Sequence, residues 1–213
     1  YSTGNVESDD SFVGGFCGLN SASQISNSYS TCSVISSAYN AGGFCGENIF
    51  NALINTCYST GAVSCDYYGG GFCGLNDGSS SISYCYSIGT VTITGDYRGG
   101  FLGQNYSGGV AICCFWNITT TGITDAVGVG DDSGITGLTD QQFSDPSNFS
   151  CFDFGKDWIM PSSLRYGDKF GNYPILRSIL FTFFIPTLTE WAIIIFICLL
   201  AGVGGWFVGR RFV

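Results

Sequence analysis

The sequence predicts a mostly β fold: a short β-solenoid of 28–29-residue rungs, an irregular cap, and one long C-terminal apolar α-helix. The clearest sign is the segment GGFCGLN at residues 14–20. It returns as GGFCGEN at 42–48, GGFCGLN at 70–76 and GGFLGQN at 99–105, in steps of 28, 28 and 29 residues. Self-similarity at a fixed period of this length is typical of stacked supersecondary units.

A tyrosine-led segment repeats with the same period. It starts at Tyr1, Tyr29, Tyr58 and Tyr86, with a degenerate copy at Phe115, so its steps are 28, 29, 28 and 29 residues. The units are rich in Gly, Ser, Thr and Tyr and show no helical spacing, which favours short strands joined by tight turns. A β-sandwich is the alternative all-β fold, but it does not need an in-register period.

Parallel rungs stack equivalent positions, so the repeated Gly-Phe pair predicts a glycine column beside an aromatic ladder. Glycine there permits a tight backbone path that a Cβ would obstruct. The asparagine that ends each copy predicts a ladder of side-chain hydrogen bonds, with ligand binding as the alternative. The repeat-core residues are Gly15, Phe16, Gly43, Phe44, Gly71, Phe72, Gly100 and Phe101, and the asparagines are Asn20, Asn48, Asn76 and Asn105.

Six of the eleven cysteines follow the repeat and are disulfide candidates: Cys17, Cys45, Cys57, Cys73, Cys85 and Cys114. Pairing within a rung, pairing offset by one rung and vertical pairing within a column all remain open, since the rung spacing suits the Cα separation of a disulfide. The alternative is that they are small buried residues in stacked interior positions. No metal site is expected, because no pair has CxxC spacing and no histidine is present.

Composition excludes several classes of function. The absence of His removes Ser-His-Asp and Cys-His catalysis. Before Pro186 the chain carries 15 acids and 5 bases, a net −10, so nucleic-acid binding is not expected. Asp131 and Asp132 lie in a Gly-rich stretch without the ligand spacing of a calcium loop, which favours a solvated turn. Ten cysteines before Pro186 favour an oxidising compartment, and a removed secretion leader would fit the absence of an initiator Met.

The predicted domains are solenoid repeats at 1–137, a capping segment at 138–178 and a hydrophobic helix at 179–213. Residues 118–137 suit a last irregular rung or a loop, and residues 138–149 suit a short helix. A cap is expected because the last rung of a solenoid otherwise presents an unpaired edge.

The C-terminal prediction rests on residues 191–208 (WAIIIFICLLAGVGGWFV), which are apolar throughout. As a helix they would extend about 27 Å, close to the thickness of a bilayer core. Pro186 suits the first turn, and Arg210 and Arg211 suit the helix end and the positive-inside tendency. The segment is therefore expected to be transmembrane-like or the core of a filament.

Two family resemblances follow from these motifs. The GGFCG cores alternating with Tyr-Ser-Thr-Gly segments resemble GLUG-motif repeats of bacterial and archaeal surface proteins, with Cys where that family commonly has Val. Residues 185–191 (IPTLTEW), the apolar run and the Arg pair are similar to an IPTL-type C-terminal sorting segment. The resemblance implies an exported bacterial surface protein that is handled at the membrane through its tail.

The predicted function is that of a non-enzymatic structural subunit of an extracellular filament, without cofactors. The start of the tail resembles, in layout only, a type IV pilin helix, so tails are expected to bundle into a homo-oligomeric helical polymer, with small residues in close contact. A membrane during biogenesis and surface glycans are the other expected partners. The alternatives are a membrane-anchored adhesin and a carbohydrate-active β-helix. The expected assembly residues are Pro186, Glu190, Trp191, Ala201, Gly202, Gly204, Gly205, Arg210 and Arg211.

Overall fold

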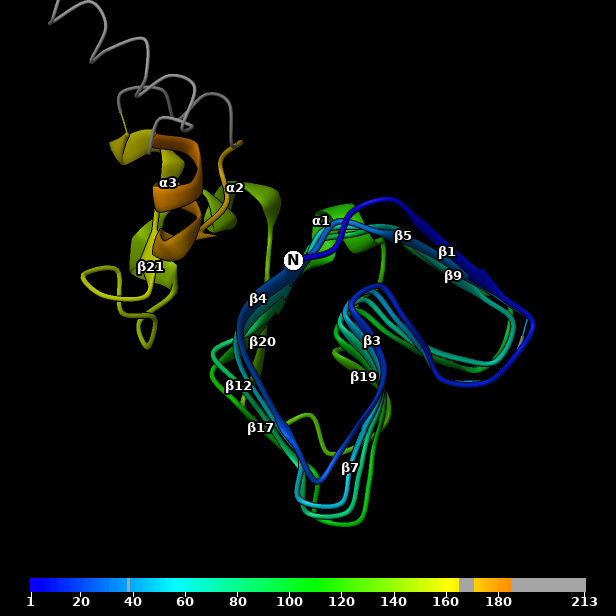
Figure 1. Cartoon of the computed structure of the whole chain (residues 1–213). Helices are drawn as coiled ribbons and strands as arrows, with labels where there is room; N and C mark the ends of the chain where they lie inside the picture. Colours follow the sequence, from blue (N-terminus) through cyan, green and yellow to red (C-terminus); the bar gives the residue numbers. More distant parts are fainter. Residues whose placement is uncertain (38, 165–170, 185–213) are drawn as a thin grey trace, which may run out of the picture. The chain divides into compact units, whose positions relative to one another are not determined.

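The computed structural model describes residues 1–37, 39–164 and 171–184. The chain divides into two compact units, Tyr1–Leu176 and Arg177–Val213, which are described separately. The first unit contains a parallel β-solenoid of about four turns. Figure 1 looks along its stack, so that successive turns coloured from blue to green lie over one another. The predicted solenoid is therefore confirmed.

Four parallel sheets run along the stack, and each takes one strand or more from each turn. The first contains β1 (Asn5–Ser8), β5 (Ser33–Ser36), β9 (Val63–Cys65) and β14 (Val91–Ile93). The second contains β2 (Val13–Gly14), β6 (Ala41–Gly42), β10 (Tyr68–Gly70) and β15 (Tyr97–Gly99). The third contains β3 (Cys17–Ser21), β7 (Cys45–Ile49), β11 (Cys73–Asn76), β16 (Leu102–Asn105) and β19 (Val127–Gly130). The fourth contains β4 (Gln24–Ser30), β8 (Leu53–Ser59), β12 (Ser81–Ser83), β13 (Tyr86–Ser87), β17 (Val110–Ile112), β18 (Cys114–Asn117) and β20 (Ile135–Leu138).

The register of these sheets pairs equivalent repeat positions. Val34 lies beside Val63, Asn48 beside Asn76, and Tyr58 beside Tyr86. Parallel strand pairing continues beyond the fourth copy of the repeat, because β19 pairs with β16 and β20 pairs with β18. Residues 118–137 thus supply a partial last rung, as the sequence indicated.

The core of the solenoid consists of two clusters. The larger lies between the third and fourth sheets and holds the phenylalanine and cysteine columns. The smaller holds aliphatic residues of the first two sheets, including Val34, Ala41 and Val63. Each inward position repeats on every rung, so burial follows the 28–29-residue period.

The capping segment packs along the side of the stack. It contains α2 (Asp140–Phe143), the 3-10 helices η1 (Pro146–Asn148) and η2 (Pro161–Ser163), and the antiparallel pair β21 (Trp158–Ile159) and β22 (Ile175–Leu176). Trp158 contacts Tyr58 and Tyr86, and Phe149 contacts Phe115. These three ring positions belong to successive rungs. The segment therefore packs against several rungs, whereas its predicted role was to cover the last edge.

The short helix expected within residues 138–149 is present as α2. Thr139 caps it in a reciprocal arrangement: its side chain accepts from the Gln142 backbone, and the Gln142 side chain accepts from the Thr139 backbone. The preceding helix, α1 (Ile118–Thr121), is capped in turn by the Asn117 side chain, which accepts from two backbone amides.

The predicted long C-terminal apolar helix is wrong as a description of this fold. The part of the chain that the structure describes contains three short α-helices, and the last of them, α3, spans Arg177–Phe184. No helix among the described residues is long and apolar enough to cross a membrane. The predicted assembly positions from Pro186 to Arg211 lie outside the described residues. A run of apolar residues shows that a segment is hydrophobic. A helix obtains most of its stability from packing against a partner surface, and the sequence of one chain does not show what that surface is.

Candidate functional site

The repeat-core phenylalanines form one continuous stack. Phe16 and Phe44 have ring centroids 4.8 Å apart, Phe44 and Phe72 5.0 Å, and Phe72 and Phe101 4.9 Å, with interplanar angles of 3°, 4° and 7°. The three inner rings are fully buried, whereas Phe16 is only partly buried. The predicted aromatic ladder is present, because parallel in-register strands carry equivalent side chains one rung apart.

The glycines beside these rings are required by the closeness of the next rung. A Cβ on Gly43 would lie 2.4 Å from the carbonyl oxygen of Gly71, and a Cβ on Gly71 would lie 2.4 Å from that of Gly100. Neither glycine has the left-handed backbone in which glycine is favoured for its torsion angles. The requirement for glycine thus comes from close backbone approach.

The Gly-Gly-Phe segments and the tyrosine-led segments share one period because residues of the two segments contact each other. The Ser59 hydroxyl donates to the carbonyl oxygen of Gly71 at 2.7 Å, and the Ser87 hydroxyl donates to that of Gly100 at 2.8 Å. Each serine follows the repeated tyrosine, and each glycine precedes the repeated phenylalanine. A buried serine thereby satisfies its hydroxyl and joins the fourth sheet to the turn before the third.

The repeated asparagines form the predicted hydrogen-bonded ladder. Asn20 Nδ2 donates to Asn48 Oδ1 at 2.8 Å, Asn48 donates to Asn76 at 2.8 Å, and Asn76 donates to Asn105 at 3.0 Å. Asn105 Nδ2 ends the series by donating to the backbone oxygen of Asp131 at 2.7 Å. All four side chains are buried, so the ladder satisfies groups that would otherwise be costly to remove from water.

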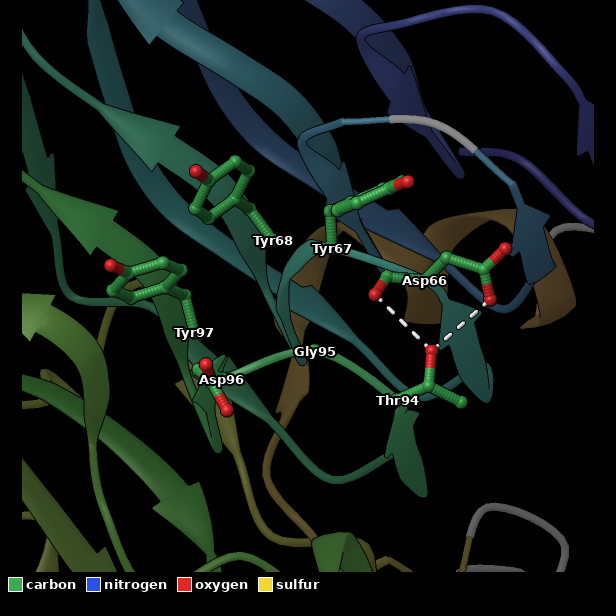
Figure 2. A pocket seen from close by; sticks show the side chains of 7 residues that line it. All are labelled: Asp66, Tyr67, Tyr68, Thr94, Gly95, Asp96 and Tyr97. Carbon is green, nitrogen blue, oxygen red and sulfur yellow. Dashed lines mark hydrogen bonds between the residues drawn. The ribbon is translucent and has the colours of Figure 1, made fainter.

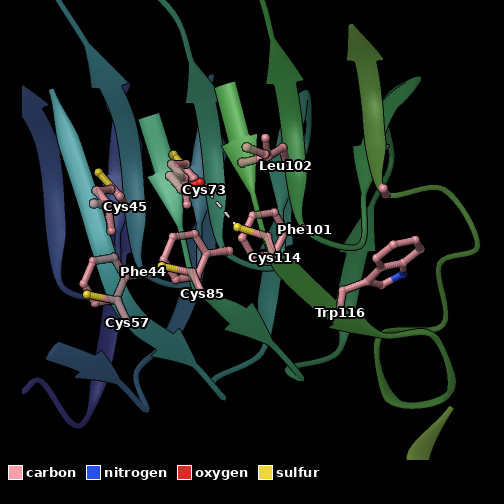
Figure 3. Close-up of a cluster of buried hydrophobic side chains, with 14 of the residues drawn as sticks. Phe44, Cys45, Cys57, Cys73, Cys85, Phe101, Leu102, Cys114 and Trp116 are labelled. Carbon is pink, nitrogen blue, oxygen red and sulfur yellow. Dashed lines mark hydrogen bonds between the residues drawn. The ribbon is translucent and has the colours of Figure 1, made fainter. Parts of the chain in front are cut away.

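The six repeated cysteines are free thiols, so none of the candidate disulfides among them is formed. They lie in two columns beside the phenylalanine rings. Figure 3 labels Cys45 and Cys73 of one column and Cys57, Cys85 and Cys114 of the other. Each thiol bonds a backbone oxygen two residues away, as Cys45 does with Glu47 at 3.0 Å and Cys85 with Ser83 at 3.1 Å. The structure supports the alternative, that these are small residues filling stacked interior positions.

Burial makes several of the free thiols poor nucleophiles. It raises the pKa of Cys114 to about 12 and that of Cys65 to about 11, and it raises the pKa of Cys85 with a further contribution from the Cys57 thiol. A hydrogen bond with the Cys45 thiol raises the pKa of Cys17. Because the thiolate is the reactive form, these residues will be inert near neutral pH.

One disulfide joins Cys113 to Cys151, with Cα atoms 6.3 Å apart and a sequence separation of 38 residues. Neither cysteine was among the sequence candidates. Cys113 has a positive φ of 56°, as do its counterparts Thr56 and Tyr84 at 54°. Cys114 occupies the buried position of this bend. Cys113 and Cys151 lie outside both repeating columns, but so do the free cysteines Cys32 and Cys65, so spacing alone did not identify the bonded pair.

Other predicted positions fall into two groups. Asp131 bonds the backbone and hydroxyl of Ser133 in an exposed turn, which lowers its pKa, and this agrees with the predicted solvated turn. The assembly positions of the tail lie outside the described residues, as does the IPTL-type segment.

Comparison with known proteins adds one finding to this geometry. Residues 66–92 match the model of the GLUG motif. The match covers 27 of 213 residues, about the length of one rung, and includes the third Gly-Gly-Phe copy and the fourth tyrosine copy. The predicted GLUG repeat is therefore supported, while the IPTL-type segment stays a prediction. Neither the curated proteins nor the solved structures yielded a match.

Proposed function

We propose that this chain is a non-enzymatic structural subunit of an extracellular surface filament. The coarser statement has direct support, since the GLUG motif and the β-solenoid both fit a surface or structural protein. The observation that carries the proposal is the in-register stack of rungs, in which repeat-core side chains contact their counterparts on adjacent rungs. Equivalent positions that repeat from rung to rung in this way hold adjacent rungs together, which suits a structural subunit.

The interior columns favour structure over chemistry. Apart from the half-buried Cys17, the cysteines and asparagines that the sequence singled out are buried, and they are bonded to one another or to nearby backbone groups. Their roles are therefore packing and hydrogen bonding within the stack. The repeated polar residues contribute to cohesion between rungs, which is consistent with a non-enzymatic protein.

The disulfide supports an extracellular location. Cys113 belongs to the last full rung and Cys151 to the capping segment, so the bond fastens the cap to the solenoid. Such bonds form and persist in oxidising compartments and are rare in cytosol. Eight further cysteines of the described residues are free thiols, and seven of them are buried, which limits their oxidation.

Assembly is proposed to involve the apolar sequence at residues 191–208. Eighteen successive apolar residues are poorly suited to water, and gathering such segments from several subunits would remove them from solvent.

A membrane-held adhesin is the second candidate. An exposed hollow lined by tyrosines and acidic residues on the solenoid favours it, because surface binding needs an accessible site. A carbohydrate-active β-helix remains the third hypothesis.

The deciding experiment is electron microscopy of the native protein sheared from cells and pelleted without detergent, with the intact mass measured on the same sample. Uniform fibres whose subunit mass includes residues 186–213 are expected. Dispersed or vesicle-bound particles, or a mass that lacks these residues, would contradict the filament and favour the adhesin.

A further inference from the structure

An open hollow of about 450 Å³ lies on the outer surface of the third and fourth rungs. It is formed by the bend between β9 and β10 and the equivalent bend between β14 and β15. Figure 2 shows Tyr68 and Tyr97 on one side of it and Asp66 with Thr94 on the other. Its volume falls within the range of small-ligand sites, about 300–1,000 Å³. None of the structural columns described above contributes to it.

Tyrosines provide most of the apolar surface of the hollow. The Tyr68 and Tyr97 rings stack with centroids 4.9 Å apart, and Tyr39 of the preceding rung stacks on Tyr67 at 4.7 Å and lies 5.6 Å from Tyr68. Tyr67 and Tyr97 are nonetheless 47% and 39% exposed. Stacking holds the rings in place before a ligand arrives, so little side-chain entropy is lost on binding.

Acceptor oxygens surround these rings. The Thr94 hydroxyl donates to the backbone oxygen and to Oδ1 of Asp66, both at 3.2 Å, which fixes one carboxylate at the rim. Asp96 provides a second exposed carboxylate, and in Figure 2 it projects near Gly95. Among the described residues that line the hollow, none is basic. The site therefore presents carboxylates and hydroxyls that can accept hydrogen bonds next to apolar rings.

Two classes of ligand suit tyrosines and carboxylates: a carbohydrate and a quaternary ammonium. An ammonium is held by ring faces that surround it. Here the rings stack on one another along the solenoid, with Tyr68 lying beside both Tyr39 and Tyr97, so they form a row in place of a cage. A row of amphipathic rings bordered by acceptors matches a sugar, which offers apolar C–H faces and many hydroxyl donors.

We propose that this hollow binds a carbohydrate, with Tyr67 and Tyr97 contacting the sugar ring and Asp66 and Asp96 accepting hydrogen bonds from its hydroxyls. The row of tyrosines follows the stack from the second rung to the fourth, so a linear oligosaccharide would extend along the solenoid axis. The proposal does not depend on filament assembly, because every residue in it belongs to the solenoid of a single chain.

The test is binding of the full-length protein to a printed array of neutral and anionic oligosaccharides, followed by titration with the strongest binder. Tyr97→Ala and Tyr67→Ala should each weaken binding by roughly tenfold, as expected when a central aromatic contact is truncated. Tyr106→Ala is the matched control, because Tyr106 is 40% exposed but does not line the hollow. It should bind as the unaltered protein does, and circular dichroism should show that all three variants are folded.

Asp96→Asn separates the two ligand classes. The amide keeps an acceptor for a sugar hydroxyl, so most of the sugar affinity should remain, whereas an ammonium site would lose its charge partner. Tetramethylammonium chloride is the competing probe and should leave sugar binding unchanged.

Three results would overturn the proposal: no oligosaccharide binding by the unaltered protein, binding by both tyrosine-to-alanine variants that is as strong as that of the unaltered protein, or displacement of the sugar by tetramethylammonium.

Discussion

Replacing Phe72 with alanine should remove the centre of the aromatic ladder. The Phe72 ring is fully buried and stacks between Phe44 at 5.0 Å and Phe101 at 4.9 Å. Truncation would break both stacks and leave a void between them. The neighbouring rungs cannot close this void, because their spacing is set by backbone hydrogen bonds such as that from the Phe72 amide to the Phe101 oxygen, 2.9 Å long.

The size of the effect follows from this rigidity. Replacing a buried Phe with Ala costs about 3–5 kcal/mol, and the cost rises when the site cannot collapse. Each aromatic pair adds roughly 0.5–1.5 kcal/mol beyond area burial. We therefore expect Phe72→Ala to lower the free energy of unfolding by about 4–5 kcal/mol. Phe16→Ala should cost only about half as much, since Phe16 is partly exposed and its only ladder neighbour is Phe44.

The assay is unfolding in guanidinium chloride followed by far-UV circular dichroism. Phe50→Ala serves as the control, because Phe50 is 63% exposed and should change stability by no more than about 0.5 kcal/mol. If Phe72→Ala and Phe16→Ala cost the same, or if Phe72→Ala costs less than about 1 kcal/mol, the inference that the ladder stabilises the stack would be refuted.

Four further predictions concern the asparagine ladder, the disulfide, a buried carboxyl group and the free thiols. Asn76→Ala should destabilise the fold by about 2–3 kcal/mol in the same unfolding assay, because it leaves one N–H of the buried Asn48 amide without its side-chain acceptor. Cys113→Ser should lower the free energy of unfolding by roughly 4 kcal/mol, according to the chain-entropy relation for a 38-residue separation. An equal loss of stability when the unaltered protein is reduced would identify the bond with Cys151 as the cause. Burial raises the pKa of Glu47, so its ionisation opposes folding: the stabilising contribution is complete below the unfolded pKa and is lost as the pH rises through the folded one. Glu47→Gln should therefore be more stable than the unaltered protein at pH 7, and the difference should disappear near pH 4; equal stabilities at both pH values would contradict the assignment. Iodoacetamide should leave the seven buried free thiols of the described residues unmodified in native protein and alkylate all of them in guanidinium chloride, as peptide mass mapping would show.

The repeat was predictable because it is a property of the chain itself. Two landmarks with the same 28–29-residue period imply in-register parallel stacking, and stacking in turn implies the phenylalanine and asparagine columns. The contact between Ser59 and Gly71 shows why the two repeated segments occur together: the serine after the tyrosine donates the hydrogen bond, and the glycine before the phenylalanine accepts it. The solenoid could be predicted from the period of the sequence because every rung repeats the same local contacts.

The cysteines mark the limit of that inference. Their spacing permitted several disulfide patterns, and only the tertiary structure shows that the columns are buried thiols bonded to backbone oxygens. It also shows that the bonded pair, Cys113 and Cys151, lies outside the columns. Which side of the stack the cap covers was likewise decided by packing between distant segments, through contacts such as Trp158 with Tyr86.

The sequence by itself determined the period, the strand register and the identity of the stacked residues, because these depend on spacing along one chain. The tertiary structure alone decided which thiols pair, where the cap packs and which exposed tyrosines surround a hollow. Those features depend on how bends from different rungs approach one another. The hollow is the clearest case, because Asp66-Tyr67 and Asp96-Tyr97 are 30 residues apart in the chain and meet only through the stacking of two rungs.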